Sequence, residues 1–317
     1  MLYNPDSGGR RGRRRQVELE SALKALHQGN VDAEIVLSHS TTEAQERVRQ
    51  AIQAGCDTIF ACGGDGTINN VIQVLANTRV ALAILPLGTA NALAHDIGLP
   101  MNVVAAARAV LRGTLLRVAL GRIQYLDLEG SQGTRFFVVG AGAGVDAHLF
   151  YKLHSGTKQR MGMAAYYAKA WHLWFTHPMA RFQVEFAETG AGEMRRAEVT
   201  ELMAIRIRNF GGVLQELAPG SSLERDDLRL VFCRTSSRLA YLLYVTRGLL
   251  RRKWKVPGID LAYSNRVSCA YTGGTDSISA TPVRSKVYIE TDGELVGTLP
   301  AEVTVVPDAL TLLAPAR

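Results

Sequence analysis

Short apolar segments alternate with segments of helical periodicity over the first hundred residues, and no other feature of the chain constrains the fold as strongly. Strands are expected at residues 2–3, 33–37, 58–61 and 81–85, where apolar side chains cluster. Between them, apolar residues recur near helical spacing at residues 16–27, 42–54 and 68–76. Strands that alternate with helices in this way predict βαβ units and therefore a parallel sheet.

The pattern changes after Leu116, where β-type segments bounded by turns predominate. Strands are expected at residues 120–128, 135–139, 182–186, 198–207, 228–232, 283–290 and 303–306, with helices at 161–175 and 239–250. The expected fold class is an α/β N-terminal domain with a parallel sheet, residues 1–118, followed by a C-terminal antiparallel β-sandwich domain, residues 119–317.

Charge and composition narrow the classes of partner. The chain has 36 Lys and Arg against 29 Asp and Glu, a net charge of +7, which favours nucleotide phosphate, nucleic acid or a lipid surface as partner. Its 47% of hydrophobic residues excludes wholesale disorder, and four cysteines without a CxxC pair indicate buried thiols in a reducing compartment.

No signal peptide is expected, and the longest uncharged run, residues 80–94, is shorter than the roughly 18 residues of a membrane-spanning helix. The first strand is so short that a natural start upstream of Met1 is left open.

The most informative local signal is Gly63-Gly64-Asp65-Gly66-Thr67, which follows an expected buried strand and precedes an apolar helix. Three glycines in four residues let the backbone approach a ligand closely, and the amides at a helix N-terminus favour phosphate. A carboxylate in such a loop is consistent with a divalent cation between it and the phosphate. The alternative is a tight strand-to-helix turn in which Asp65 is the N-cap.

Two further polar loops, residues 4–9 and 86–91, also follow expected strands. Because the carboxyl ends of parallel strands meet at one edge of a sheet, these loops favour a nucleotide site there. The pattern G-x-x-x-x-G-K-[ST] is absent from the sequence, and Gly140, Gly142 and Gly144 do not complete G-x-G-x-x-G.

These segments, in this order, resemble the diacylglycerol kinase catalytic-domain family, which comprises soluble bacterial lipid kinases related to the sphingosine and ceramide kinases. The motifs that carry the resemblance are N-P-x-S-G at 4–8, G-G-D-G-T at 63–67, P-x-G-T-x-N at 86–91, G-x-G-x-D-A at 142–147, N-F-G-G at 209–212 and D-G-E at 292–294. The resemblance covers nearly the full length and implies a fold of the NAD-kinase and diacylglycerol-kinase type.

The resemblance also implies that ATP binds the N-terminal domain and that a lipid hydroxyl enters the cleft against the C-terminal domain. By match to the family motifs, the residues that would hold the nucleotide are Asn4, Thr42, Gly63, Gly64, Gly66, Thr67, Gly88, Thr89 and Asn91. Asp65 would organise Mg²⁺ through water, Asp292 would be the general base, and Glu294 would orient groups or assist the metal. The alternative for residues 290–294 is an ordinary hairpin turn.

Two positions depart from the family pattern. Ala92 stands where many bacterial members have a carboxylate that joins the magnesium and water network. The segment 219–223 lacks the usual aspartate of a loop that sometimes binds a structural cation, although Asp226 and Asp227 follow it.

Basic and aromatic residues gather in three places. Five arginines lie within residues 10–15, and basic residues surround Trp254 at 251–255; both clusters suit anionic lipid headgroups, and the first also suits ATP phosphates. Solvated surface charge is the alternative for each. The aromatic residues of 161–175 either line an acyl-chain channel or the membrane interface, or pack on their own domain.

The sequence therefore predicts an ATP- and Mg²⁺-dependent lipid kinase that transfers the γ-phosphoryl group to the hydroxyl of a diacylglycerol-like or long-chain lipid alcohol. The alternatives are an NAD kinase or other small-metabolite kinase, and a non-catalytic lipid-binding relative. The protein is expected in the cytoplasm, peripherally associated with the inner face of the membrane, and nucleic acid is not an expected partner. The identity of the lipid and the formation of a homodimer are left open.

Overall fold

A parallel sheet forms the N-terminal half of the molecule, as the alternation of strands and helices predicts. The computed structural model describes residues 1–5, 12–145, 147, 176, 179–210, 217–250, 252, 254–272 and 286–316. The parallel strands are β1 (Leu2–Tyr3), β2 (Val36–Leu37), β3 (Thr58–Gly63) and β4 (Ala81–Pro86). They lie in the order β2–β1–β3–β4, and each pairs in parallel with its neighbour.

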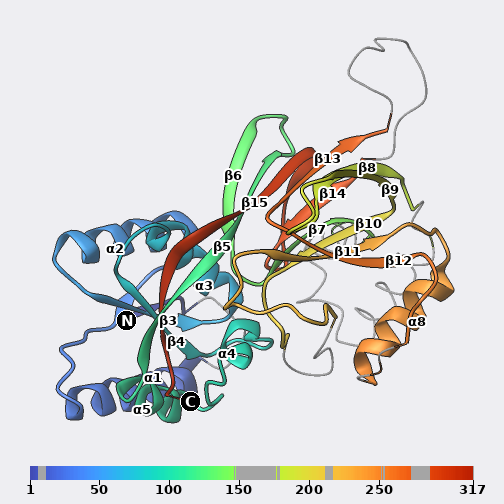
Figure 1. Cartoon of the computed structure of the whole chain (residues 1–317). Helices are drawn as coiled ribbons and strands as arrows, with labels where there is room; N and C mark the ends of the chain where they lie inside the picture. The colour runs from blue at the N-terminus through green and yellow to red at the C-terminus, as the bar shows by residue number, and fades with distance from the viewer. Residues whose placement is uncertain are drawn as a thin grey trace.

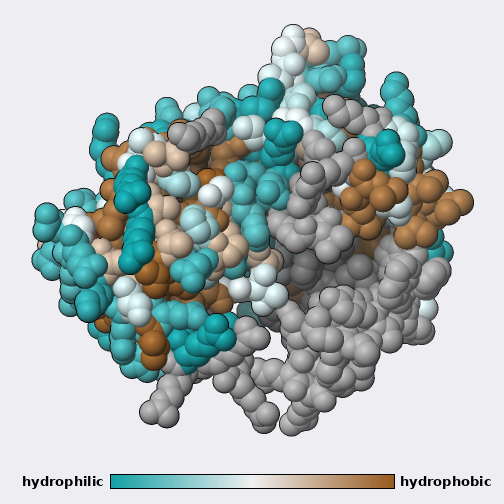
Figure 2. Space-filling model, turned by 90° about the horizontal axis from the view of Figure 1, so that it is seen from below, coloured by the Kyte–Doolittle hydropathy of each residue, from teal (hydrophilic) through white to brown (hydrophobic). Residues whose placement is uncertain are grey.

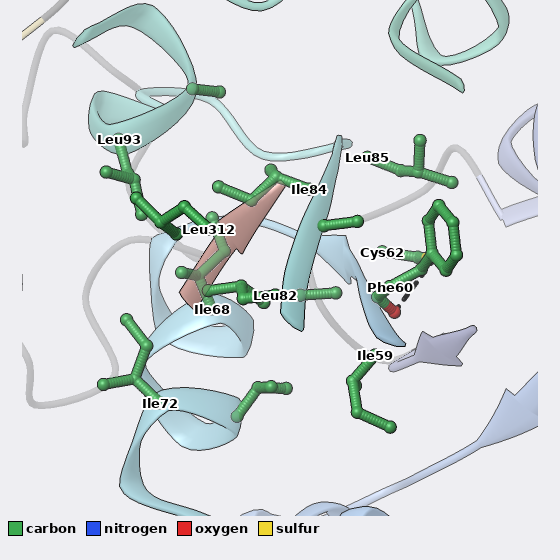
Figure 3. Packing of buried hydrophobic residues seen from close by; sticks show 14 of the residues in the cluster. Ile59, Phe60, Cys62, Ile68, Ile72, Leu82, Ile84, Leu85, Leu93 and Leu312 are labelled. Atoms are coloured by element: carbon green, nitrogen blue, oxygen red, sulfur yellow. Dashed lines mark hydrogen bonds between the residues drawn. The ribbon is translucent and has the colours of Figure 1, made fainter. Parts of the chain in front are cut away.

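Helices cover this sheet: α1 (Gly12–Gln28), α2 (Thr41–Gln53), α3 (Asp65–Leu75), α4 (Ala92–Asp96) and α5 (Val103–Leu111). The helix α2 begins where Ser40 caps it, because the Ser40 side chain accepts a hydrogen bond from the Glu43 amide. Apolar spacing in the sequence predicts α1, α2 and α3 but not α4 and α5. Figure 3 shows the core between β3, β4 and α3, where Ile68 and Leu82 lie near Leu312 from the end of the chain.

Two long strands, β5 (Thr114–Leu126) and β15 (Glu294–Ala314), join the two halves of the molecule. They pair antiparallel along most of their length, and Figure 1 shows them running from the C-terminal half into the N-terminal half. The end of β15 pairs in parallel with β4, so the last residues of the chain complete the first sheet. The predicted division at residue 118 is not tested and stays a prediction.

The expected strand at 303–306 is only the middle of β15. Its pairing with β5 shifts register between Thr298 and Ala301 and again between Val306 and Leu310. Pro300 and Pro307 lie within these two irregular stretches. Proline has no amide hydrogen to donate to a β-ladder and is accommodated at bulges. Two prolines therefore made one continuous strand unpredictable from the sequence.

The C-terminal half is antiparallel, as predicted. Its further strands are β6 (Gln132–Phe137), β7 (Gly140–Gly144), β8 (Phe182–Ala187), β9 (Met194–Val199), β10 (Glu201–Ile205), β11 (Leu228–Cys233), β12 (Ile259–Ser264), β13 (Arg266–Tyr271) and β14 (Tyr288–Thr291). One branch has the order β15–β14–β7–β10–β11–β12, and another has the order β15–β13–β8–β9. The rings of Phe186 in β8 and Phe232 in β11 stack with their centroids 4.7 Å apart, so the two branches face each other across a shared core.

Three details of this half differ from the prediction. The expected strand at 198–207 is divided at Thr200, whose hydroxyl hydrogen-bonds the carbonyl oxygens of Cys233 and Thr235. The segment Gly140–Gly144, which is not among the expected strands, is the strand β7 between β10 and β14, and β12 and β13 are likewise not among them. The expected helix at 239–250 is α8 (Arg238–Leu249), whereas the helix expected at 161–175 lies outside the described residues. Within the described chain, no helix is long and apolar enough to cross a membrane.

Candidate active site

The two predicted loops after β3 and β4 begin at the same edge of the parallel sheet as residues 4 and 5, the described part of the third. Tyr3 at the end of β1 is in register with Cys62, and Gly63 is in register with Pro86, so β1, β3 and β4 end side by side. The Leu87 amide donates to the Gly63 carbonyl at 2.9 Å, which continues the pairing into the loops. Asn4 therefore lies beside the G-G-D-G-T loop, as the parallel arrangement requires.

The loops after β3 and β4 approach each other so closely that a side chain collides at Gly88 and is tight at Gly64. A Cβ at Gly64 would lie 3.1 Å from the Gly88 Cα, and a Cβ at Gly88 would collide with the Gly64 Cα. Asn91 holds the second loop in place, since its side chain accepts from the Gly88 amide and donates to the Gly88 carbonyl, each at 3.0 Å. Thr89 is exposed at the tip of the same loop.

Asp65 connects the two loops through its carboxylate. One oxygen accepts the Asn91 amide at 3.0 Å and the other accepts the Ala92 amide at 2.8 Å, at the start of α4. The suggestion that Asp65 caps its own helix is wrong, because Gly64 is the N-cap of α3. Each oxygen has accepted one hydrogen bond and has capacity for another, which leaves the carboxylate able to hold a water or a cation.

Asp65 accepts two hydrogen bonds, whereas Asp292 accepts four. It lies between β14 and β15 with a backbone φ of 48°, in the left-handed region. Its Oδ1 accepts the amides of Val139 (2.9 Å) and Gly140 (3.0 Å). Its Oδ2 accepts the Val138 amide (3.1 Å) and the Asn69 side-chain amide (2.8 Å). Burial raises the pKa of Asp292 above the ordinary carboxyl value, although these four hydrogen bonds lower it.

Glu294 lies against the G-G-D-G-T loop. A Cβ at Gly66 would lie 2.9 Å from Glu294 Oε1, while Oε2 forms an ion pair with Arg135 of β6. Arg135 also donates to Asn69 Oδ1 from Nη2 at 2.8 Å and from Nε at 3.1 Å. One network thus joins α3, β6 and the D-G-E turn, with Asn69 bonded to both Arg135 and Asp292.

Beside this network is a polar cavity of about 330 Å³. It lies between the start of α2, the helix α3 and the hairpin of β5 and β6, and it is lined by Thr41, Gln45, Asn70, Gln73, Tyr125, Thr134, Arg135 and Phe136. The predicted phosphate contact Thr42 is exposed and is not among the lining residues, whereas its neighbour Thr41 is. Thr41 Oγ1 accepts a hydrogen bond from Asn70 at 3.3 Å, which ties α2 to α3 at the cavity.

The structure therefore brings the G-G-D-G-T loop, the P-x-G-T-x-N loop and the D-G-E turn into one site. Sequence reasoning missed Asn69, Gln73 and Arg135, because helical polar residues and a strand arginine carry no local pattern that distinguishes them from surface residues. Asp146 of the G-x-G-x-D-A motif and Gly211 and Gly212 of the N-F-G-G motif lie outside the described residues.

The fit to a magnesium ion rests on Asp65. No group of three or more His, Cys, Asp or Glu side chains within the described ranges is arranged to hold a metal. Mg²⁺ commonly keeps several waters and binds one or two carboxylates together with substrate phosphates. One carboxylate with spare acceptor capacity, beside a helix N-terminus suited to phosphate, fits an ion held largely by nucleotide and water.

Comparison with known proteins agrees with the motifs. Residues 1–123 match the family model of the diacylglycerol kinase catalytic domain. A diacylglycerol kinase of Bacillus subtilis is 27% identical, with 95% of this chain and 91% of that protein covered. A diacylglycerol kinase of Mycobacterium tuberculosis is also 27% identical, over 93% of this chain and 88% of that protein.

The likeness extends to solved structures. The crystal structure of a diacylglycerol kinase from Bacillus anthracis superposes with a TM-score of 0.69 at 17% identity, covering 99% of this chain and 95% of that one. At this level of identity the likeness concerns the fold, and it confirms the fold class predicted from the sequence. Together with the family model and the relatives, it confirms the resemblance that the motifs predict.

Proposed function

We propose that this chain, a kinase that carries the diacylglycerol kinase catalytic domain at residues 1–123, transfers the γ-phosphoryl group of ATP to the hydroxyl of a diacylglycerol-like or long-chain lipid alcohol. The observation that carries the proposal is the contact between the nucleotide loop and the D-G-E turn. Asn69 of α3 binds Asp292, and Gly66 faces Glu294. Phosphoryl transfer to an alcohol requires a site that positions the phosphates and a base that accepts the proton of the hydroxyl. The contact brings a loop suited to phosphate together with two carboxylates.

The ATP phosphates would lie over the G-G-D-G-T loop, where the amides at the start of α3 and the absence of side chains at Gly64 and Gly66 favour them. The polar cavity of about 330 Å³ at the start of α2 would take part of the nucleotide. Arg135, which borders both this cavity and the carboxylates, would help to neutralise the transferred phosphoryl group.

Asp292 and Glu294 differ in their capacity to accept a proton. Both oxygens of Asp292 already accept two hydrogen bonds, so its acceptor positions are occupied. Glu294 Oε1 is directed toward Gly66 and accepts no hydrogen bond from the described residues. We therefore assign the proton from the lipid hydroxyl to Glu294, with Asp292 as the positioning residue that holds the turn. This assignment exchanges the roles expected from the sequence.

Magnesium would be held at Asp65 through water and through the nucleotide phosphates. When bound, such an ion neutralises phosphate charge and stabilises the transferred group. Ala92 donates its backbone amide to Asp65, a hydrogen bond that a residue with a longer side chain could also make, and its methyl group adds no ligand for an ion at Asp65.

The lipid would enter from the C-terminal half. A small apolar cavity of about 10 Å³ lies within the antiparallel strands and is lined by residues that include Gly142, Ala143 and Ile289. Ile289 belongs to β14, the strand that leads directly into the D-G-E turn. At this volume the cavity is a packing space no larger than one water, so it does not itself hold a hydrocarbon chain, and the entry of the lipid from this half is proposed from the family resemblance.

The purified full-length protein should transfer radiolabel from γ-labelled ATP to diacylglycerol in mixed micelles with Mg²⁺. Glu294→Gln should lower kcat by at least roughly a hundredfold while leaving the KM for ATP nearly unchanged, since general-base catalysis contributes about 10²–10⁴. Glu302→Gln is the matched control, because Glu302 lies on the same strand and pairs with Arg266 away from the site. Full activity of Glu294→Gln would overturn the assignment, and label on NAD instead of lipid would overturn the proposed function.

A further inference from the structure

We propose that the exposed face of α8 docks on an anionic phospholipid bilayer. The observation behind this is that the polarity of the helix is inverted. Its buried positions are Ala240, Tyr244, Arg247 and Gly248. Its exposed side chains, by contrast, are large and apolar: Leu239, Leu242, Leu243, Val245, Leu249 and the C-cap Leu250. Leu239 is 63% exposed and Leu250 is 58% exposed.

The exposed apolar residues form one continuous stripe. At 3.6 residues per turn, the positions from Leu239 to Leu250 cover roughly half of the helix circumference. In Figure 2 apolar side chains gather on the right of the molecule, where α8 lies in Figure 1. A helix that faces water normally presents its polar residues there, so a stripe of this size indicates a partner surface.

The helix cannot turn to bury this stripe, because its opposite side is fixed. Ser237 caps its first turn by accepting the Ala240 amide. The Tyr244 hydroxyl donates to the Leu217 carbonyl, and the Arg247 guanidinium lies 4.4 Å from the centre of the Tyr244 ring. Ala240 and Tyr244 pack with Val231 of β11 in a separate apolar cluster. The leucines are therefore presented outward by the packing itself.

The positive charge near the exposed apolar stripe favours an anionic partner. Residues 234–256 contain seven Arg and Lys and no Asp or Glu; of these, Arg247 is buried against Tyr244 and Arg234 pairs with Asp260. Arg252, Trp254 and Lys255 are exposed just beyond the end of the helix. An apolar helix face bordered by basic residues and a tryptophan is the chemistry of helices that lie in a membrane interface beside anionic headgroups.

A second copy of this chain fits the surface less well. An isologous contact through α8 would bring the basic residues of two copies together without acidic partners from the same segment, and like charges across an interface oppose association. A lipid bilayer supplies both an apolar layer for the leucines and negative charge for the basic border. The proposal adds a membrane contact to the kinase and does not depend on which lipid is phosphorylated.

The test is sedimentation of the full-length protein with vesicles, without ATP. Vesicles of phosphatidylcholine alone are compared with vesicles that also contain phosphatidylglycerol, at low and at physiological salt. The wild type should bind the anionic vesicles at least tenfold more tightly, and salt should weaken the binding. The double variant Leu242→Asn, Leu249→Asn should lose at least tenfold in this binding and keep the thermal midpoint of the wild type.

The matched control is Leu115→Asn, Leu128→Asn, which replaces two leucines in and just after β5 that are more exposed than Leu242 and Leu249, and it should bind vesicles like the wild type. Activity on a water-soluble short-chain diacylglycerol should be the same in all three proteins, because α8 lies outside the catalytic residues. No binding of the wild type to anionic vesicles, or equal binding of the α8 variant, would overturn the proposal. So would a dimer that the α8 variant dissociates without any change in vesicle binding. Vesicle binding without kinase activity would leave the docking surface standing and overturn the kinase proposal.

Discussion

The two halves of the molecule arrange their functional loops by opposite means. In the N-terminal half, the loops after β3 and β4 come together because side chains are missing at Gly64 and Gly88. In the C-terminal half, distant segments are held together by buried side chains with ionisable groups that bind backbone groups. Asp292 collects three amides from residues 138–140, and Arg206 collects four carbonyl oxygens. The first site should therefore be sensitive to size and the second to charge.

Arg206 is the cationic counterpart of Asp292. Its guanidinium donates to the carbonyls of Arg225 (2.6 Å), Asp227 (2.7 Å), Ala119 (3.0 Å) and Leu223 (3.3 Å). Burial lowers the pKa of Arg206 to about 10, so the side chain remains protonated at neutral pH. This is the loop in which the sequence lacks the aspartate associated with a structural cation. Here the guanidinium provides the positive charge that the carbonyl oxygens attract.

The largest loss of stability is expected for Arg206→Met. Four buried carbonyl oxygens would lose their donor, which should lower the free energy of unfolding by about 3–5 kcal/mol, the range for breaking a buried charged network. Urea unfolding followed by circular dichroism measures this change. Arg229→Met is a control, because Arg229 lies over the Tyr263 ring instead. Its replacement should lower the free energy of unfolding by less than Arg206→Met does. EDTA should leave the stability of the wild type unchanged, and a loss of stability with EDTA would contradict the role given to Arg206.

Gly88→Ala tests the sensitivity of the first site to size. The added Cβ would collide with the Gly64 Cα and lie 2.6 Å from Asn91 Oδ1, so the two loops must separate. Misplacement of a substrate-positioning loop by about 1 Å can cost roughly a hundredfold in rate, equivalent to about 2.7 kcal/mol. The loss should appear in kcat/KM for ATP in the lipid kinase assay. Ala90→Ser, an exposed change in the same loop, should retain activity, and an active Gly88→Ala would contradict the close approach.

The same contrast explains what could be predicted from the sequence. Glycine loops that follow apolar strands are local patterns, so these loops and the parallel sheet were predictable from spacing. The partners of Asp292 are separated from it by more than 150 residues, as in the Val138 contact, and no local pattern encodes such a contact. Residues such as Asn69 and Arg135 gain their roles only when β6 packs on α3. The strand β7 was missed for a related reason, because a Gly and Ala segment has no strand propensity until neighbouring strands enclose it.

The last prediction concerns the charge of Asp292 and has the smallest expected effect. Asp292→Asn keeps the size of the side chain but places an amide group opposite backbone donors, which should lower the free energy of unfolding by about 1–3 kcal/mol. Because burial raises the pKa of Asp292 in the folded protein, ionisation destabilises the fold relative to the protonated form. The contribution of the wild-type residue is complete below the pKa of the unfolded chain and declines as pH rises through the raised value.

The difference in unfolding free energy between wild type and Asp292→Asn should therefore be largest in acid and shrink toward neutral pH, by about 1.4 kcal/mol for each unit of pKa elevation. Asp96 also has its pKa raised by burial, against hydrogen bonds from Asn209 and Arg208, so it adds a decline of the same sign to both proteins and cancels in the comparison. Urea titrations at a series of pH values measure the difference. A difference that grows as pH rises would mean that the four hydrogen bonds outweigh burial, and Asp292 would then be a structural anion whose charge stabilises the turn.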